Sequence, residues 1–223
     1  MPAQSNNPLI RWDWVFNEWD QIWAALVEHM ELTFYAMTLG LALSIPLAAM
    51  ALRYRVTAAP ITAFTGFLYT LPSVALFGLL VPFFGLSRLT AVIPLAGYTL
   101  LVLVTNIIAG FRSVSAPVRT AADAMGLTPP RRVLGVELPL ATPYIITGIR
   151  IATVSTVGLV TVAAIIGQGG LGSLILDGLK RSFWTPMVVG AVLSILLALV
   201  LDLLILWLGR KATPWTQRRA ATP

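Results

Sequence analysis

The chain has 223 residues, of which 57% are hydrophobic and 11% charged, and its mean hydropathy is +0.85. A soluble domain normally carries about a quarter charged residues, so this composition predicts a membrane protein. The chain has no cysteine and one histidine, His29, which excludes a disulfide framework and a thiolate metal site and argues against His-dependent catalysis. The net charge of +6 is better explained by arginines in cytoplasmic loops than by binding of nucleic acid.

The first 30 residues do not resemble a secretory signal peptide, because they lack a basic start followed by an apolar core. Indole rings settle at the membrane surface, so residues 1–30 are predicted to form an amphipathic, interfacial segment on the periplasmic side. The alternative is a helix packed against the protein's own flank. Both interpretations depend on aromatic and apolar residues that recur at helical spacing: Trp12, Phe16, Trp19, Trp23 and Leu26.

Membrane-spanning helices need about 20 mostly apolar residues, and five stretches are long enough. These stretches cover residues 31–52, 60–84, 89–111, 146–167 and 187–209. The predicted fold class is therefore an all-α integral membrane protein with five transmembrane helices. It divides into the segment 1–30, a transmembrane domain at 31–209 and a tail at 210–223.

Helix-breaking residues mark the expected ends of these spans. The run Gly85-Leu86-Ser87-Arg88 predicts a tight turn between the second and third spans. Thr142-Pro143 and Thr185-Pro186 each offer an N-cap followed by proline at the first helical position. We expect these two pairs to start the fourth and fifth spans.

The orientation follows from the distribution of basic residues between the two sides. One side holds Arg53, Arg55, Arg112, Arg119, Arg131, Arg132, Arg210, Lys211, Arg218 and Arg219. The other side holds Arg11, Arg88, Lys180 and Arg181. Cytoplasmic loops carry the excess of Lys and Arg, so the N-terminus is predicted to lie outside and the C-terminal tail in the cytoplasm.

The long loop at 112–145, on the predicted cytoplasmic side, is the most informative stretch. Ser115 is expected to cap a short helix over 116–125, and Gly126 follows where a left-handed conformation costs glycine little. A second capped helix is expected to end at Leu138-Pro139. The pattern predicts a helix–turn–helix on the cytoplasmic face. A DNA-binding role is disfavoured, because both ends are tethered to membrane helices.

The same loop resembles a known family motif. The run Thr120-Ala121-Ala122-Asp123-Ala124-Met125-Gly126 is followed, after nine residues, by Val136-Glu137-Leu138-Pro139. This spacing resembles the EAA motif of ABC importer permeases: Glu-Ala-Ala, three residues, Gly, nine residues, Ile, any residue, Leu-Pro. Thr120 departs from the motif, since the family has Glu there. The resemblance implies the type I ABC importer permease fold, with 31–209 as the permease domain.

In that family the first short helix is the coupling helix, which docks in a groove of the ATPase subunit. The resemblance implies an ATPase-coupling role for Ala121, Ala122 and Gly126, with Leu138 and Pro139 as the structural end of the same element. The implied partners are two ATP-binding subunits, a second permease (identical or paralogous), an extracytoplasmic substrate-binding protein and membrane lipid. The implied location is the bacterial plasma (inner) membrane, crossed several times. The chain ends soon after the fifth span, so we expect the substrate-binding protein to be a separate polypeptide.

Three further runs resemble the osmoprotectant branch, whose members import glycine betaine, carnitine and choline. They are Leu71-Pro72-Ser73-Val74-Ala75-Leu76, Gly148-Ile149-Arg150 and Ile166-Gly167-Gln168-Gly169-Gly170-Leu171-Gly172. The resemblance implies an ATP-driven importer of compatible solutes in which this chain forms the translocation pathway. Methionine-importer permeases share the five-span plan and a similar glycine run. Methionine or another small metabolite is therefore the alternative substrate.

Quaternary ammonium groups are typically held by aromatic faces through cation–π attraction. Tyr69, Phe77 and Tyr98 lie in predicted spans, and with Pro72 and Ser73 they are the candidate pathway residues. Ordinary packing against lipid or core is the alternative for any single aromatic residue.

The glycine run Gly167, Gly169, Gly170 and Gly172 fits the dinucleotide fingerprint G-x-G-x-x-G. That fingerprint needs a preceding β-strand, whereas a membrane span precedes this run, so a dinucleotide site is rejected. The glycines are instead expected to act as gate or turn residues, letting the chain unwind at the outer end of the fourth span. A short outer helix at 171–181, near the binding protein, is expected to follow.

No catalytic constellation or phosphate-binding loop is visible in the sequence. The two lysines, Lys180 and Lys211, do not follow a glycine-rich P-loop, so ATP is expected to bind to partner subunits and the chain to be no enzyme, without cofactor or metal. A membrane-embedded enzyme or a passive channel is the distant alternative. Asp202 is either a functional acid or part of a structural pair. We expect His29 to be structural and Arg150 to anchor the start of the fourth span at the interface.

Overall fold

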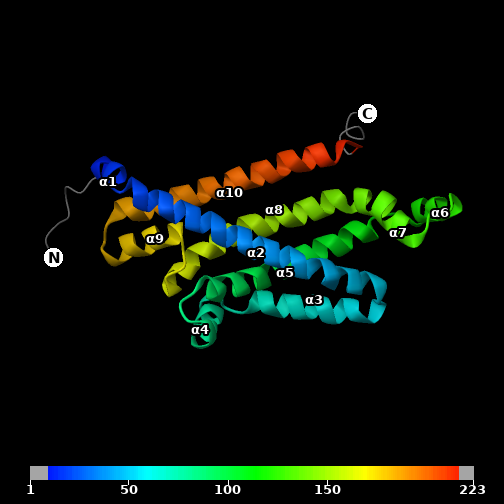
Figure 1. Cartoon of the computed structure of the whole chain (residues 1–223), viewed down its shortest axis with the longest axis horizontal. Helices are drawn as coiled ribbons and strands as arrows, with labels where there is room; N and C mark the ends of the chain where they lie inside the picture. Colours follow the sequence, from blue (N-terminus) through cyan, green and yellow to red (C-terminus); the bar gives the residue numbers. More distant parts are fainter. Residues whose placement is uncertain (1–9, 216–223) are drawn as a thin grey trace. The chain divides into compact units, whose positions relative to one another are not determined.

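The computed structural model describes residues 10–215, and in this range it contains helices and no β-strand (Figure 1), which confirms the all-α prediction. The predicted segments 1–30 and 210–223 lie partly outside the described residues, and Arg218 and Arg219 lie wholly outside them. The division of the chain into these segments stays a prediction. The α-helices are α1 (Trp12–Asn17), α2 (Trp19–Arg53), α3 (Arg55–Thr70), α4 (Ser73–Phe84), α5 (Arg88–Arg112), α6 (Ala116–Ala124), α7 (Pro129–Arg132), α8 (Leu138–Val162), α9 (Leu171–Lys180) and α10 (Trp184–Ala212). A π-helix, η1 (Val133–Glu137), precedes α8, and a 3-10 helix, η2 (Ala163–Ile166), follows it.

Four helical stretches in the described range are long and apolar enough to cross a membrane, or five if the broken pair α3 and α4 is one span. They contain α2, α5, α8 with its flanking turns, and α10. The five-span count of the sequence therefore agrees with the structure. The helix α2 runs without a break past residue 31, so the helix of the first span begins earlier than expected.

The second span, expected as one helix over 60–84, is interrupted. Leu71 and Pro72 are both extended, with ψ angles of 138° and 125°. Proline has no backbone N–H and disfavours the helical conformation in the residue before it. The carbonyl of Leu71 accepts a hydrogen bond from the hydroxyl of Tyr98, which satisfies the acceptor that the break leaves free.

The expected helix start at Thr142-Pro143 and the expected helix end at Leu138-Pro139 are both wrong. The helix α8 begins at Leu138 and contains Pro139 and Pro143. Thr142 does not cap a helix, because its hydroxyl donates to the Leu138 carbonyl at 2.7 Å. Proline is tolerated in a first helical turn, and the π-helix η1 changes the hydrogen-bonding register directly before it.

The fifth span also starts differently from the sequence expectation. The helix α10 begins at Trp184, so Thr185 is already helical. The Thr185 hydroxyl oxygen accepts a hydrogen bond from the backbone N–H of Arg11 at 2.9 Å. Its oxygen therefore binds the segment before α1 instead of capping α10.

The contacts of the chain divide it into two compact units. Unit 1 contains the residues up to Ala36, Pro72–Leu95 and Thr156–Leu199. Unit 2 contains Met37–Leu71, Ala96–Ser155 and the residues from Val200 onward. The glycine run therefore belongs to unit 1, and the 112–145 loop belongs to unit 2.

Small and branched residues form the core of unit 2, where α2, α3 and α5 pack together. The closest approach is at Gly40, where a Cβ atom would lie 1.9 Å from the hydroxyl oxygen of Thr99. Glycine at this position lets α2 and α5 come together in the membrane. The buried core cluster consists of Ala48, Ala51, Ile61, Val104, Ile107 and Ile108.

Candidate functional site

The first half of the 112–145 loop folds as predicted. The helix α6 ends with Met125 as its C-cap, and Gly126 follows with φ of 77°. The N–H of Gly126 donates to the Asp123 carbonyl at 2.9 Å, and the N–H of Leu127 donates to the Ala122 carbonyl at 3.2 Å. These two bonds form a Schellman motif, which favours glycine because its central residue is left-handed.

The second half of the loop differs from the expectation of a separate second helix. The elements α7, η1, α8 and η2 form one continuous helical stretch over Pro129–Ile166. Leu138 and Pro139 lie in the first turn of α8. They therefore connect the loop directly to a span instead of ending a separate helix. Ser115 occupies the N-cap position of α6 as predicted, but its side chain makes no capping hydrogen bond.

The small residues of α6 differ in exposure. Ala121 is exposed and Ala122 is buried, at 1% exposure. The hydroxyl of Thr120 donates to the Ala116 carbonyl at 3.1 Å, so it turns back onto its own helix. Gly126 is exposed at the turn. Ala121 and Gly126 are thus on the open surface of the loop, whereas Ala122 packs inward.

Charged side chains connect the parts of this loop in a way that the sequence did not predict. Arg132 on α7 donates from Nη1 to both carboxylate oxygens of Asp123 on α6, at 2.6 and 2.8 Å. Arg119 on α6 donates from Nη2 to the carbonyl of Phe111, in the last turn of α5, at 2.6 Å. Both arginines also face Glu137, which is buried. The sequence signal was present, because the loop has two acids among four arginines.

The glycine run forms a turn in unit 1, as predicted. After η2, Gly167 and Gly170 have φ of 75° and 50°, and α9 then begins at Leu171. Gly169 packs closely on Ala164, where a Cβ atom would lie 2.4 Å from the alanine backbone. The expected helix at 171–181 is confirmed over Leu171–Lys180. A gating role for the four glycines stays a prediction.

Replacement of Gly172 by alanine is expected to destabilise unit 1. An added Cβ would lie 2.2 Å from the carbonyl oxygen of Thr161, which is backbone and cannot move aside easily. Overpacking of this kind costs about 1–3 kcal/mol of unfolding free energy. Thermal unfolding in detergent measures the effect.

The matched control is Gly158→Ala on α8, where no atom lies within 4 Å of an added Cβ. Alanine has the higher helix propensity, so this variant should unfold at the same temperature as the original protein or slightly higher. Equal unfolding temperatures for the Gly172 and Gly158 variants would contradict the close approach at Gly172.

The single histidine of the chain lies beneath this turn. His29 is fully buried, and its Nε2 atom lies 3.0 Å from the Val157 carbonyl oxygen. A Cβ at Gly170 would lie 2.6 Å from the backbone nitrogen of His29. The expectation of a structural histidine is consistent with this burial, and the site explains why position 170 has no side chain.

The candidate pathway residues are divided between the two units. In unit 2 the rings of Tyr69 and Tyr98 meet edge to face, with centroids 6.1 Å apart. In unit 1 Pro72 precedes α4, Ser73 is its first residue, and Phe77 is fully buried. The Phe77 ring is therefore core in this conformation. A pathway role for these residues stays a prediction.

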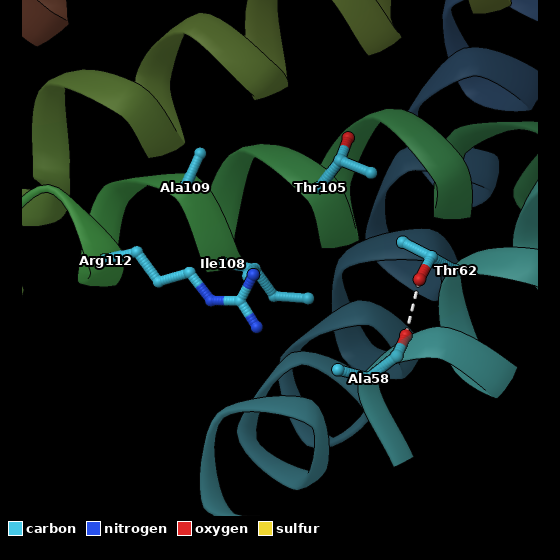
Figure 2. Close-up of a pocket in the computed structure, with 6 residues that line it drawn as sticks. All are labelled: Ala58, Thr62, Thr105, Ile108, Ala109 and Arg112. Atoms are coloured by element: carbon cyan, nitrogen blue, oxygen red, sulfur yellow. Dashed lines mark hydrogen bonds between the residues drawn. The ribbon is translucent and has the colours of Figure 1, made fainter. Parts of the chain in front are cut away.

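A cavity of about 310 Å³ lies between α3 and α5 in unit 2, as Figure 2 shows. The hydroxyls of Thr62 and Thr105 both donate to carbonyls of their own helices, those of Ala58 and Leu101. Arg112 is the one charged lining residue, and no aromatic ring lines the cavity. This cavity therefore lacks the aromatic faces that bind a quaternary ammonium group. Its six lining residues are Ala58, Thr62, Thr105, Ile108, Ala109 and Arg112.

An ion pair joins two predicted spans within unit 2. Arg150 Nε and Nη2 donate to the two carboxylate oxygens of Asp202 at 2.8 and 2.7 Å. Arg150 lies well inside α8 and not at the start of a helix, and its role as an interface anchor stays a prediction. The structural pairing of Asp202 is confirmed, with a partner that sequence reasoning missed. One signal could have found it, because an acid and an arginine inside spans are expected to pair.

Comparison with known proteins agrees with this architecture. Residues 40–214 match the family model described as binding-protein-dependent transport system inner membrane component. The osmoprotectant import permease protein OsmW of Salmonella typhimurium is 37% identical over 84% of this chain and 89% of its own length. The choline transport system permease protein OpuBB of Bacillus subtilis is 34% identical over 86% of this chain and 88% of its own length.

Solved structures show the same fold at lower identity. An inward-facing MetNI methionine ABC transporter chain matches with a TM-score of 0.71, at 20% identity, over 92% of this chain and all of that chain. An amino acid ABC transporter chain matches with a TM-score of 0.75, at 17% identity, over 91% of this chain and 99% of that chain. The fold is therefore that of ABC importer permeases. Together with the match over residues 40–214, this shows that the chain belongs to the family of inner membrane components of binding-protein-dependent transport systems.

Proposed function

We propose that this chain is the permease subunit of an ATP-driven importer of compatible solutes of the glycine betaine, choline and carnitine class. The observation that carries the proposal is the 112–145 loop, in which the glycine turn after α6 leads into one helical stretch with span α8. The substrate class is supported by relatives whose names specify osmoprotectant, choline, or glycine betaine, carnitine and choline transport. The methionine transporter is 20% identical, so it supports the fold and not the substrate.

The proposed mechanism assigns ATP hydrolysis to other polypeptides. Two ATP-binding subunits close on ATP and press on the exposed surface of α6, which includes Ala121. The turn at Gly126 and the stretch through Leu138 and Pro139 carry that displacement into α8. Paired with a second permease, identical or paralogous, the spans then change the side on which the pathway is open. A substrate-binding protein delivers the solute from outside, and the chain itself needs no cofactor.

The N-terminal segment combines the two roles considered for it. Trp12, Phe16 and Trp23 are more than half exposed, which supports contact with the membrane interface. Trp14 packs edge to face on Phe183, with ring centroids 5.8 Å apart, so another side of α1 is held by the protein. We propose that this segment lies in the interface and is fixed there by the turn before α10.

The proposed orientation places the N-terminus outside and the C-terminus in the cytoplasm. A reporter fused after Thr213 is expected in the cytoplasm, and one inserted before Trp12 is expected outside, because ten basic residues against four favour this arrangement. Paired alkaline phosphatase and fluorescent protein fusions measure the two positions. Both ends on one side would contradict a five-span chain.

The substrate proposal is tested by uptake of radiolabelled solutes in cells with and without this chain. The panel contains glycine betaine, choline, carnitine, proline and methionine. Uptake of at least one of the first three is expected to depend on the chain. Dependence of methionine uptake alone would support the alternative substrate and overturn the proposed class.

A further inference from the structure

The loop in unit 2 contains a carboxylate that is shielded from solvent. Glu137 is the last residue of η1 and directly precedes α8, and its side chain is 9% exposed. The other acid of the loop, Asp123, is exposed. A buried carboxylate is unfavourable unless cations compensate it, so the partners of Glu137 reveal what its burial holds together.

Two arginines from different helices converge on one oxygen of this carboxylate. Arg132 on α7 donates from Nε to Oε1 of Glu137 at 2.9 Å. Arg119 on α6 places its Nε atom 3.7 Å from the same oxygen. The far end of the Arg119 guanidinium binds the carbonyl of Phe111 on α5. The Glu137 carboxylate, directly before α8, is thus connected through Arg119 to α6 and to the end of α5.

Two backbone hydrogen bonds close the turn after α6, but nothing packs on it at the Cβ position of Gly126. Gly126 has open space around it, with no atom within 4 Å of the Cβ position, and the chain continues to α7 through Leu127 and Thr128. No carboxylate is present at position 120, because Thr120 stands there. Side-chain contacts therefore act together with the backbone turn at Gly126 in setting the angle between α6 and the base of α8.

We propose that Glu137 is the positioning residue that holds α6 against the base of α8 through Arg119 and Arg132. Because Glu137 connects the two helices, a displacement of α6 moves α8 and is not absorbed by bending of the loop at Gly126. The role rests on the proposed function, since it describes how coupling reaches α8. Glu137 touches neither solute nor nucleotide in this scheme.

The test uses the complete reconstituted complex with its ATPase subunits and loaded binding protein. Glu137→Gln keeps the side-chain size and removes the charge that the two arginines share. We expect uptake to fall about tenfold or more, and stimulation of ATP hydrolysis by loaded binding protein to fall with it, while the ATPase subunits still co-purify. Glu137→Asp keeps the charge and is expected to recover part of the uptake, which a purely volumetric role would not produce.

Two further variants keep the test decisive. Arg119→Gln leaves Glu137 paired with Arg132, and α6 bound to α7 through Asp123 and Arg132, but removes the direct contact between α6 and Glu137. It is therefore expected to lose coupling even if Glu137→Gln fails to assemble. Arg131→Gln, an exposed arginine of the same loop, removes a charge without touching Glu137 and is expected to transport normally. Normal stimulation and uptake in either Glu137→Gln or Arg119→Gln would overturn the proposal. Failure of the unmodified complex to transport would instead refute the proposed function.

Discussion

Replacement of Gly126 by valine is expected to abolish solute uptake while leaving the chain inserted in the membrane. Gly126 has φ of 77°, a region that β-branched residues rarely adopt. No atom lies within 4 Å of an added Cβ, so the effect comes from backbone strain of about 1–3 kcal/mol and not from a clash. Relief of that strain would reorient α6, and Ala121 with it. The spans draw their stability from lipid burial and packing, so they should survive.

The control for this variant is Gly135→Val, in the π-helix of the same loop. Position 135 has the same open space around an added Cβ but no positive φ. We expect it to retain most of its uptake. Gly126→Asn should be intermediate, because asparagine tolerates the left-handed region better than valine. Stimulated ATP hydrolysis and uptake in the reconstituted complex are the measurements. Near-normal values for Gly126→Val would show that this loop is not the coupling element.

Removal of either partner of the Arg150–Asp202 pair is expected to destabilise the protein strongly. Each single alanine variant leaves an uncompensated charge inside a predicted span, at a cost of about 2.5–3.5 kcal/mol. The bidentate geometry, at 2.8 and 2.7 Å, supports a well-formed pair. The yield of folded protein and thermal unfolding in detergent measure the loss.

Replacement of both partners separates the cost of a lone charge from the value of the pair. The double variant Arg150→Met with Asp202→Leu is expected to recover most of the stability, because apolar residues of similar volume often substitute for a buried pair. Arg88→Ala is the matched control, since the Arg88–Glu31 pair has a 2.8 Å contact but half-exposed side chains. Its loss should cost less than about 1 kcal/mol. A double variant no more stable than the single variants would contradict this explanation.

The features predicted correctly from the sequence have local causes. The apolar stretches predict the helical class and the five-span count, because a spanning helix needs a continuous apolar segment. The turns at Gly85, Gly126 and Gly167 were predicted because glycine alone adopts positive φ at little cost, and all three do so. These signals lie within a few residues of the features that they specify.

Proline shows where local reasoning fails. Pro72 interrupts a helix, whereas Pro139 and Pro143 lie inside one. The outcome depends on partners elsewhere in the chain, such as Tyr98, whose hydroxyl binds the carbonyl left free at Leu71. A distant partner of this kind leaves no periodic signal in the sequence.

The ion pairs of the candidate site were missed for a related reason. Arg150 and Asp202 are 52 positions apart and meet only when α8 packs on α10. The tight packing is visible at Gly209, where a Cβ would lie 2.8 Å from Ile146. In the loop, Glu137 occupies a variable position of the motif, so the resemblance assigned it no role. Its burial between two arginines is a property of the fold.

The central claim is that this chain forms the solute pathway of an importer driven by separate ATPase subunits. The most direct test is uptake of radiolabelled glycine betaine, choline and carnitine into proteoliposomes that contain the purified complex. ATP is enclosed inside, and loaded binding protein is added outside. Uptake is expected to require ATP, the ATPase subunits and this chain together, and to disappear when Gly126→Val replaces the original chain. Accumulation that continues without ATP or without the ATPase subunits would contradict the claim.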